Sequence, residues 1–168
     1  MALIGIISDT HGYIDDRITA HLSDCDEIWH AGDIGKEEVT NTLKHLAPLR
    51  AVYGNIDGGK IRAEFPEEQI FTINGVSIYM IHIGGYPPRY TAKLKKRLDE
   101  LKPRIFICGH SHILKVIPDQ NRNLIHINPG AAGKHGFHKM RTLIKLTIED
   151  GKPKDLKVIE LGERASIK

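Results

Sequence analysis

The sequence predicts an α/β protein, and three observations carry that prediction. Short apolar runs of strand length alternate with helical patterns in the first half of the chain. Hairpin signals dominate the second half. The composition, with 40% hydrophobic and 27% charged residues, is that of an ordinary globular chain. The length of 168 residues favours a single domain over residues 1–168.

The first half has a βαβαβ order. Three apolar runs predict buried strands: residues 2–8, 27–31 and 49–53. Two segments between them have helical character: the one that carries Ile14, Ile18 and Leu22 four residues apart, and residues 36–46, which Pro48 ends. This order predicts a mostly parallel sheet with helices on its faces.

The second half contains two expected hairpins. Asn74-Gly75 suits a tight turn between strands at 69–73 and 76–81. The other elements follow in order: a helix at 90–101, a strand at 104–108, a hairpin of 113–117 with 124–127, and late strands at 141–148 and 156–161. Residues 54–66 form the longest segment with no regular pattern, and long loops in compact domains are often functional.

Charge and cysteine usage exclude several classes of protein. The net charge of +3 gives no case for nucleic acid or a membrane as the main partner. No apolar stretch approaches 18 residues, and the first strand lacks the basic flank of a signal peptide. Two cysteines, Cys25 and Cys108, are too few for a disulfide framework. A cytoplasmic location is therefore expected, with Cys108 in the core.

Metal-capable side chains follow five of the expected strands. In a parallel sheet such positions meet at one edge. Each of them alone is more often a cap or a turn residue. Seven together predict a metal site, and their oxygen and nitrogen donors suit Mn, Fe, Co, Ni or Zn. Seven ligands exceed one tetrahedral ion, whereas two ions that share a carboxylate would have four ligands each. The seven are Asp9, His11, Asp33, Asn55, His82, His110 and His112.

These motifs resemble the calcineurin-like metallophosphoesterases, in particular their small single-domain bacterial and archaeal branch, which is related to the retromer scaffold subunit. The family pattern D-x-H, G-D, G-N, H and G-H-x-H occurs here in order, and a late N-P-G turn follows at residues 128–130. The resemblance spans residues 2 to about 133. It implies two packed mixed β-sheets flanked by helices, a four-layer αββα fold.

The resemblance also implies a ligand set and a reaction. One ion would bind Asp9, His11, Asp33 and His112, and the other Asp33, Asn55, His82 and His110, with Asp33 bridging. The expected ions are two divalent metals, Mn²⁺ first, with Ni²⁺, Zn²⁺, Fe²⁺ or Co²⁺ as alternatives. A metal-bridging hydroxide would attack a small phosphodiester in line, so no catalytic side chain is required as the nucleophile.

Three other activities compete with the phosphodiesterase. A phosphomonoesterase would use the same ligands. A protein-interaction scaffold on this fold would tend to lose ligand histidines, which this chain keeps. A nuclease would require a longer basic groove or a further domain to bind nucleic acid. A small phosphorylated substrate is the expected partner, and self-association through residues 69–81 or the tail beyond Gly151 is a further possibility.

Two positions depart from the family pattern. Ile56 stands where many members carry the histidine that protonates the leaving group. General acid catalysis typically contributes ~10²–10⁴-fold, so poor leaving groups should react slowly. Gly84 replaces the second histidine of an H-G-H motif, and no imidazole is available there.

The remaining polar residues have more ordinary interpretations. Asp57 is expected to be a turn residue or, alternatively, to orient a ligand or fix the loop. His135 and His138 belong to a surface loop that could instead form a substrate rim. His30 and His126 are expected to pack internally, with support of the metals as the alternative for His30. His21 and His45 are expected on helix surfaces. Specificity is expected from the loops at 58–66, 84–90 and 133–140.

Overall fold

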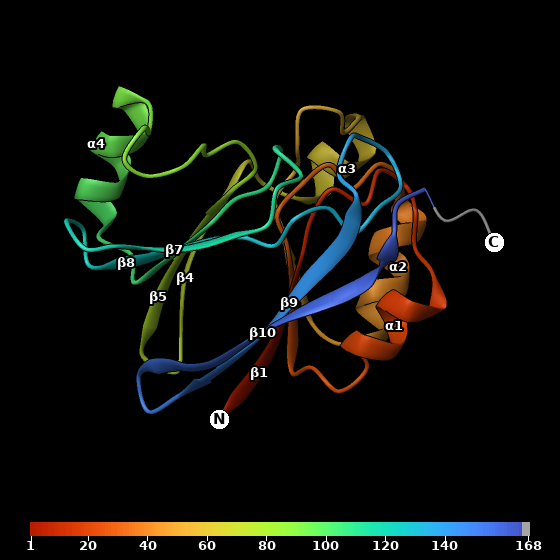
Figure 1. The fold of residues 1–168 in the computed structure, drawn as a ribbon, viewed down its shortest axis with the longest axis horizontal. Helices are drawn as coiled ribbons and strands as arrows, with labels where there is room; N and C mark the ends of the chain where they lie inside the picture. Colours follow the sequence, from red (N-terminus) through yellow and green to blue (C-terminus); the bar gives the residue numbers. More distant parts are fainter. Residues whose placement is uncertain (166–168) are drawn as a thin grey trace.

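Two five-stranded sheets pack face to face, with helices on their outer sides (Figure 1). The structure, a computed structural model, describes residues 1–165. The first sheet contains, in spatial order, β10 (Lys152–Glu163), β9 (Met140–Glu149), β1 (Ala2–Ile7), β2 (Glu27–His30) and β3 (Leu49–Ala51). The second contains β4 (Glu68–Ile73), β5 (Val76–Ile81), β6 (Ile105–Ile107), β8 (Leu124–Asn128) and β7 (Lys115–Asp119). The expected α/β fold with two mixed sheets is confirmed.

Each sheet combines three parallel strands with antiparallel neighbours. Strands β1, β2 and β3 run parallel, β9 pairs antiparallel with β1, and β10 pairs antiparallel with β9. In the second sheet β5, β6 and β8 run parallel between the antiparallel edge strands β4 and β7. The carboxyl ends of the parallel strands in both sheets carry the expected metal-binding motifs.

The core has three apolar layers. Between the sheets, Ile4, Ile6 and Trp29 of the first sheet meet Ile78, Met80 and Ile107 of the second, and all six are buried. A second layer packs the outer face of the first sheet against α1 (Asp16–Leu22), α2 (Glu37–Leu46) and α3 (Gly59–Glu64). A third packs the second sheet against α4 (Ala92–Leu101).

Local capping explains where two helices begin. The Asp15 carboxylate accepts a hydrogen bond from Ile18 N at 3.0 Å, and the Thr91 hydroxyl accepts one from Leu94 N at 3.2 Å. Side-chain oxygens at these positions satisfy backbone N–H groups that lack a partner inside the helix. The apolar residues at helical spacing, Ile18 and Leu22 in α1, face the sheet as expected.

Three expectations about elements were wrong. Residues 54–66 are not wholly irregular, because α3 lies within them. Gly58-Gly59 obscured this helix, and only Ile61 of α3 is buried, so its apolar pattern is too short to read. Strand β7 begins at Lys115 rather than at residue 113, since the loop after β6 extends further. Strand β10 spans twelve residues, with irregular register near Pro153 and Gly162.

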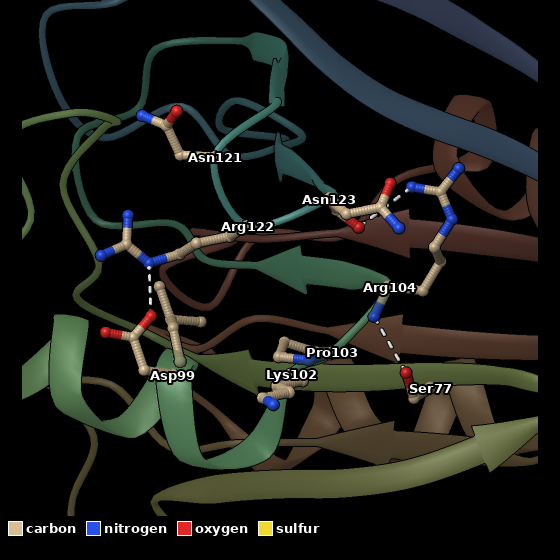
Figure 2. A pocket seen from close by; sticks show the side chains of 9 residues that line it. Ser77, Asp99, Lys102, Pro103, Arg104, Asn121, Arg122 and Asn123 are labelled. Carbon is tan, nitrogen blue, oxygen red and sulfur yellow. Dashed lines mark hydrogen bonds and ion pairs between the residues drawn. The ribbon is translucent and has the colours of Figure 1, made fainter.

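A cleft of about 640 Å³ lies at the amino ends of β5, β6 and β8, away from the metal motifs. Figure 2 shows two hydrogen bonds among its lining residues: Arg122 Nε donates to Asp99 Oδ1, and the backbone N of Arg104 donates to the Ser77 hydroxyl. Within residues 1–165, no helix is both long and apolar enough to cross a membrane. The last residues of the expected domain, 166–168, lie outside the described residues.

Candidate metal centre

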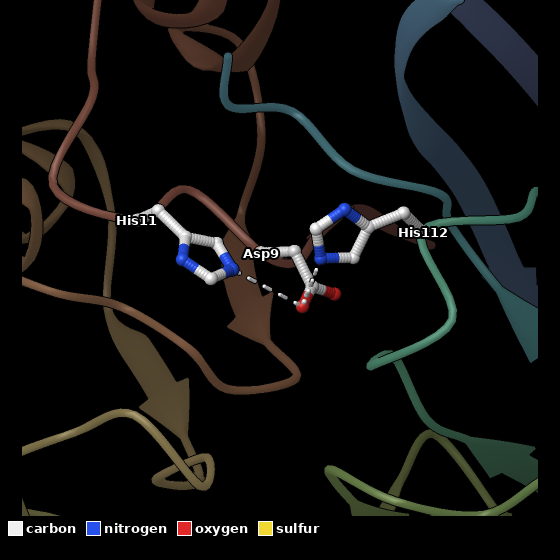
Figure 3. Close-up of side chains that lie close together, drawn as sticks. All are labelled: Asp9, His11 and His112. Atoms are coloured by element: carbon white, nitrogen blue, oxygen red, sulfur yellow. Dashed lines mark ion pairs between the residues drawn. The ribbon is translucent and has the colours of Figure 1, made fainter. Parts of the chain in front are cut away.

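The first group of candidate ligands comprises Asp9, His11 and His112 (Figure 3). Asp9 follows β1, His11 lies two residues further along, and His112 comes from the loop after β6 in the other sheet. One ligand atom from each lies within 4.8 Å of the others. The Asp9 Oδ1 atom is 3.2 Å from His112 Nε2 and 3.9 Å from His11 Nε2. Residues far apart in the sequence thus form one donor cluster.

The second group comprises Asp33, His82 and His110. Asp33 Oδ2 lies 3.2 Å from His82 Nε2 and 3.4 Å from His11 Nε2. This one oxygen therefore stands between an imidazole of each group. Such a position suits a carboxylate that two cations share, which is the role expected for Asp33.

Asn55, the seventh expected ligand, adjoins the second group. His110 Nδ1 and Asn55 Oδ1 are 3.1 Å apart, and both residues are exposed. All seven expected ligands thus lie at one end of the molecule. The position of Gly84 is buried against Phe106 and Cys108, so it offers no side-chain ligand, in agreement with the sequence.

Hydrogen bonds orient the His82 imidazole, a candidate ligand. His82 Nδ1 donates to Ala31 O at 2.7 Å, which leaves Nε2 as the ring nitrogen that faces Asp33. Metal-binding histidines commonly have their other ring nitrogen held in this way. The Asp9 carboxylate is held in a similar way: its Oδ2 accepts from the Ser8 hydroxyl at 2.6 Å and from His110 N at 3.1 Å. These bonds leave Asp9 Oδ1 directed at the histidines.

The carboxylates are held in their charged form. Burial alone would raise the pKa of Asp9, but the imidazoles of His112 and His82 lower it below its ordinary value. Burial likewise opposes ionisation of Asp33, and the His82 imidazole lowers its pKa in net. Two carboxylates that remain ionised in a buried site require positive charge nearby.

The donor set fits divalent cations. Among the described residues, Asp9 Oδ1, His11 Nε2 and His82 Nε2 are buried side-chain atoms without a hydrogen-bond partner. Buried polar atoms of this kind are costly unless something pairs with them. A cation within each group would satisfy all three, and carboxylate with imidazole suits first-row transition metals. The residues therefore fit the two ions expected from the sequence.

Backbone strain is concentrated at the candidate ligands. Five of the seven have positive φ values between 45° and 72°: Asp9, His11, Asp33, His110 and His112. Non-glycine residues adopt this region rarely, although Asp and His do so more readily than most. Each such residue costs on the order of 1–3 kcal/mol, and such strain gathers at functional sites. The surrounding structure therefore holds these residues in backbone conformations that are unfavourable for non-glycine residues.

Glycine is required in two of the motifs because neighbouring side chains lie where a Cβ atom would be. At Gly32, where φ is +102°, an added Cβ would lie 2.6 Å from His82 Nδ1. At Gly109 it would lie 2.1 Å from the Ser8 hydroxyl oxygen and 2.6 Å from Asp9 Oδ2. A side chain at either position would displace a candidate ligand. The G-D and G-H pairs thus have a steric reason, which the sequence alone does not reveal.

Asp57 holds two ligand-bearing loops together. Its carboxylate accepts backbone hydrogen bonds from Ile34 N, Gly35 N and Gly54 N at 2.7–3.1 Å. These donors flank Asp33 and Asn55. Asp57 therefore fixes these loops, which is one of the roles expected from the sequence.

His30 has the same kind of role for the loops after β1 and β2. Its Nδ1 accepts from Gly32 N at 3.1 Å, so its Nε2–H faces the Thr10 hydroxyl at 3.0 Å. The Thr10 hydroxyl donates to Ile34 O at 2.9 Å. His30 is fully buried, so it both packs internally and supports the loops after β1 and β2.

Two supporting residues were missed by the sequence analysis. Ser8 bonds to Asp9, as described above. Asn128, noted only as part of the N-P-G turn, donates to Gly109 O at 3.0 Å and to the Ser111 hydroxyl at 3.1 Å. It thereby fixes the loop that carries His110 and His112. Its place in the N-P-G turn is the only feature of the sequence that marks Asn128.

The loop at residues 134–138 reaches the centre. The His135 ring stacks on His11 with centroids 4.7 Å apart, and the His138 ring meets His112 edge-on at 5.2 Å. A cavity of about 450 Å³ is lined by both loop histidines together with ligands of each group. The loop is therefore a rim of the site rather than a remote surface segment.

The other histidines and Cys108 follow expectation. His126 is buried, and its Nδ1 bonds to the Tyr90 hydroxyl at 2.8 Å. Cys108 is fully buried, and burial raises its thiol pKa to about 12. His21 and His45 are exposed on α1 and α2. None of these belongs to either group.

Two adjoining Asp–His groups at the strand ends of a two-sheet α/β fold define a candidate metalloprotein with two cation positions. The chain belongs to the calcineurin-like phosphoesterase superfamily, whose domain pattern matches residues 2–151. It is 34% identical over 155 residues to a "Probable metallophosphoesterase" of Methanocaldococcus jannaschii, covering 88% of this chain and 77% of that one. A protein of the same name from Methanothermobacter thermautotrophicus is 32% identical over 136 residues, covering 77% and 76%.

Solved structures show the same fold. One described as a novel archaeal phosphodiesterase has a TM-score of 0.74 at 21% identity and covers 94% of this chain and 99% of its own. Vps29 of Entamoeba histolytica, solved with Zn²⁺, has a TM-score of 0.73 at 19% identity and covers 95% and 99%. Vps29 of Chaetomium thermophilum has a TM-score of 0.76 at 15% identity, with 95% and 97% covered.

Proposed function

We propose that this metallophosphoesterase is a phosphodiesterase that uses two divalent ions, one in each Asp–His group, to hydrolyse a small phosphodiester. The single observation that carries the proposal is Asp33 Oδ2, which lies between His11 Nε2 and His82 Nε2. One carboxylate oxygen shared in this way suits a pair of adjacent cations. When bound, such a pair supplies an activated water and positive charge for a phosphate.

The chain's own residues position the reaction. Asp9 and His112 would hold one ion with His11, and His82, His110 and Asn55 the other, with Asp33 common to both. The Ala31 carbonyl keeps the His82 lone pair on Nε2, and Asp57 sets the distance between the loops of Asp33 and Asn55. The Ser111 hydroxyl in the cavity is engaged by Tyr86 and Asn128, which argues against its use as a nucleophile.

Ile56 is exposed at the cavity, where many family members carry the histidine that protonates the leaving group, so esters whose leaving groups depart unaided should react fastest. The preference for a diester rests on two other supports. The cavity of about 450 Å³ has room for ester groups on either side of a phosphate. A fold relative is described as an archaeal phosphodiesterase. A phosphomonoesterase using the same residues is the second candidate.

The choice of ion and of compartment belongs to the same proposal. Mn²⁺ is our first choice, and the Zn²⁺-bound Vps29 relative supports a divalent ion in general. A cytoplasmic location is supported by Cys25 and Cys108, both free and buried.

The first experiment is hydrolysis of bis(p-nitrophenyl) phosphate by metal-stripped protein, with Mn²⁺, Ni²⁺, Zn²⁺ or Mg²⁺ restored in turn. We expect activity only with added metal, and a higher kcat/KM for this diester than for p-nitrophenyl phosphate. The variant His82→Ala should lose this activity, whereas His21→Ala, at an exposed histidine of α1, should retain it. A consistently faster monoester would favour the second candidate. Absence of turnover with every metal would contradict the proposed activity.

A further inference from the structure

Exposed apolar side chains gather beside the candidate metal centre. In residues 1–165, eight large apolar side chains are exposed. Three of them, Ile56, Ile113 and Phe137, line the cavity that also contains His11 and Asp33. Single exposed apolar residues are common on protein surfaces, but a group in a concave site indicates binding. These three come from separate loops, after β3, after β6 and before β9.

Phe137 is displayed from a loop whose backbone is held. Its side chain is 100% exposed. Beside it, His138 Nε2 donates to Gly133 O at 2.8 Å, and Arg164 Nε donates to His138 O at 2.7 Å. The stacking of His135 on His11 holds the other side of the loop. Packing within the chain therefore does not explain why an aromatic side chain stands at this position.

The cavity lining contains no lysine or arginine among the described residues. The neighbouring cavity of about 740 Å³, on the other side of Asn55 and His82, is different because Arg62, Lys93 and Lys96 line it. A ligand group with further phosphates would find no lysine or arginine side chain in the lining of this cavity. The aromatic groups in its lining instead include Phe137 and the stacked rings of His135 and His11.

We propose that this cavity binds a flat aromatic ring attached through the phosphate ester of the substrate, either a nucleobase or a phenol-derived ring. Phe137 is its specificity-determining residue. Planar rings gain affinity by stacking on aromatic side chains, and this stacking tolerates differences between rings. The inference rests on the proposed function, because the phosphate must lie at the Asp9 and Asp33 groups for the ring to reach Phe137.

Equilibrium binding to Mn²⁺-loaded protein tests the inference without turnover. Calorimetry compares phenylphosphonate with methylphosphonate at mildly alkaline pH, where both are dianions. The two differ only in the organic group. A second pair, adenosine 5′-phosphate and ribose 5-phosphate, is measured by competition with the phosphonate. The variants are Phe137→Ala, Phe137→Tyr and, as a matched exposed apolar control on β10, Val158→Ala.

We expect the ring-bearing member of at least one pair to bind roughly fivefold or more tightly, the smallest effect that stacking usually gives. The pair that shows the preference identifies the source of the ring. Phe137→Ala should reduce the preference to near unity, while Phe137→Tyr and Val158→Ala retain it. Equal binding within both pairs, or an unchanged preference in Phe137→Ala, would overturn the inference. Failure of all four ligands to bind would instead count against the phosphate site itself.

Discussion

Single side chains at this centre are set by hydrogen bonds from neighbouring backbone and side-chain groups. The Ala31 carbonyl fixes the tautomer of His82, and Ser8 together with the His110 backbone fixes the carboxylate of Asp9. His30 and His126 illustrate a cost of the same tight packing. Burial lowers the pKa of each from the ordinary value of 6.5 to about 4, so both are neutral in the folded protein at pH 7.

This lowering predicts an acid-dependent loss of stability. Between pH 6.5 and pH 4 an unfolded chain binds a proton at His126 that the folded chain does not. The free energy of unfolding must therefore fall as the pH falls through this window, by about 3 kcal/mol for a histidine shifted this far. Urea unfolding across the window measures the slope. His126→Gln should make the slope shallower, and the exposed control His21→Gln should not. An unchanged slope in His126→Gln would show that this histidine does not contribute.

At the scale of elements, the ligands depend on loops that are joined across strand ends. Asp57, which precedes α3, accepts three backbone hydrogen bonds from the loops after β2 and β3. It thereby couples the spacing of Asp33 and Asn55. An equivalent connection joins the two sheets, where His110 N donates to Asp9 Oδ2.

Asp57→Asn should weaken this coupling, because an amide nitrogen would face at least one backbone N–H. We expect a loss of about 1–3 kcal/mol in the free energy of unfolding and roughly 10–100-fold weaker metal binding. Urea unfolding and Mn²⁺ titration measure the two effects. Asp119→Asn is the matched control, since Asp119 is also buried but pairs with Arg122 beside the amino end of β8, away from the candidate ligands. Asp119→Asn should lower the free energy of unfolding and leave the Mn²⁺ affinity unchanged. Equal metal affinity in both variants would leave Asp57 without a role at the centre.

At the scale of the whole molecule, periodic and local signals predicted most of the fold. The βαβαβ order and the Asn74-Gly75 turn each have short-range causes that a sequence displays. The short helix α3 has only one buried side chain, Ile61, and therefore left almost no pattern. The packing of one sheet on the other depends on contacts such as Trp29 with Phe71, whose sequence separation hides them.

The candidate ligands were predictable because each lies in the segment that follows a strand. The residues that support the candidate ligands were harder to predict. The need for glycine at 32 and 109 arises from side chains that approach across the two sheets. The position of His135 over His11 depends on a loop between β8 and β9 that has no periodic pattern. Long-range contacts determine both, and only the folded chain displays them.

The most direct test of the account is the number of metal ions that Asp33 holds. Mn²⁺ titration of metal-stripped protein should give two ions per chain for the wild type. Asp33→Ala should weaken both by roughly tenfold or more, a size that loss of even a supporting residue can reach. Asp155→Ala, at an exposed carboxylate of β10, should bind as the wild type does. Two ions bound to Asp33→Ala with undiminished affinity would contradict the shared carboxylate, and with it the paired centre.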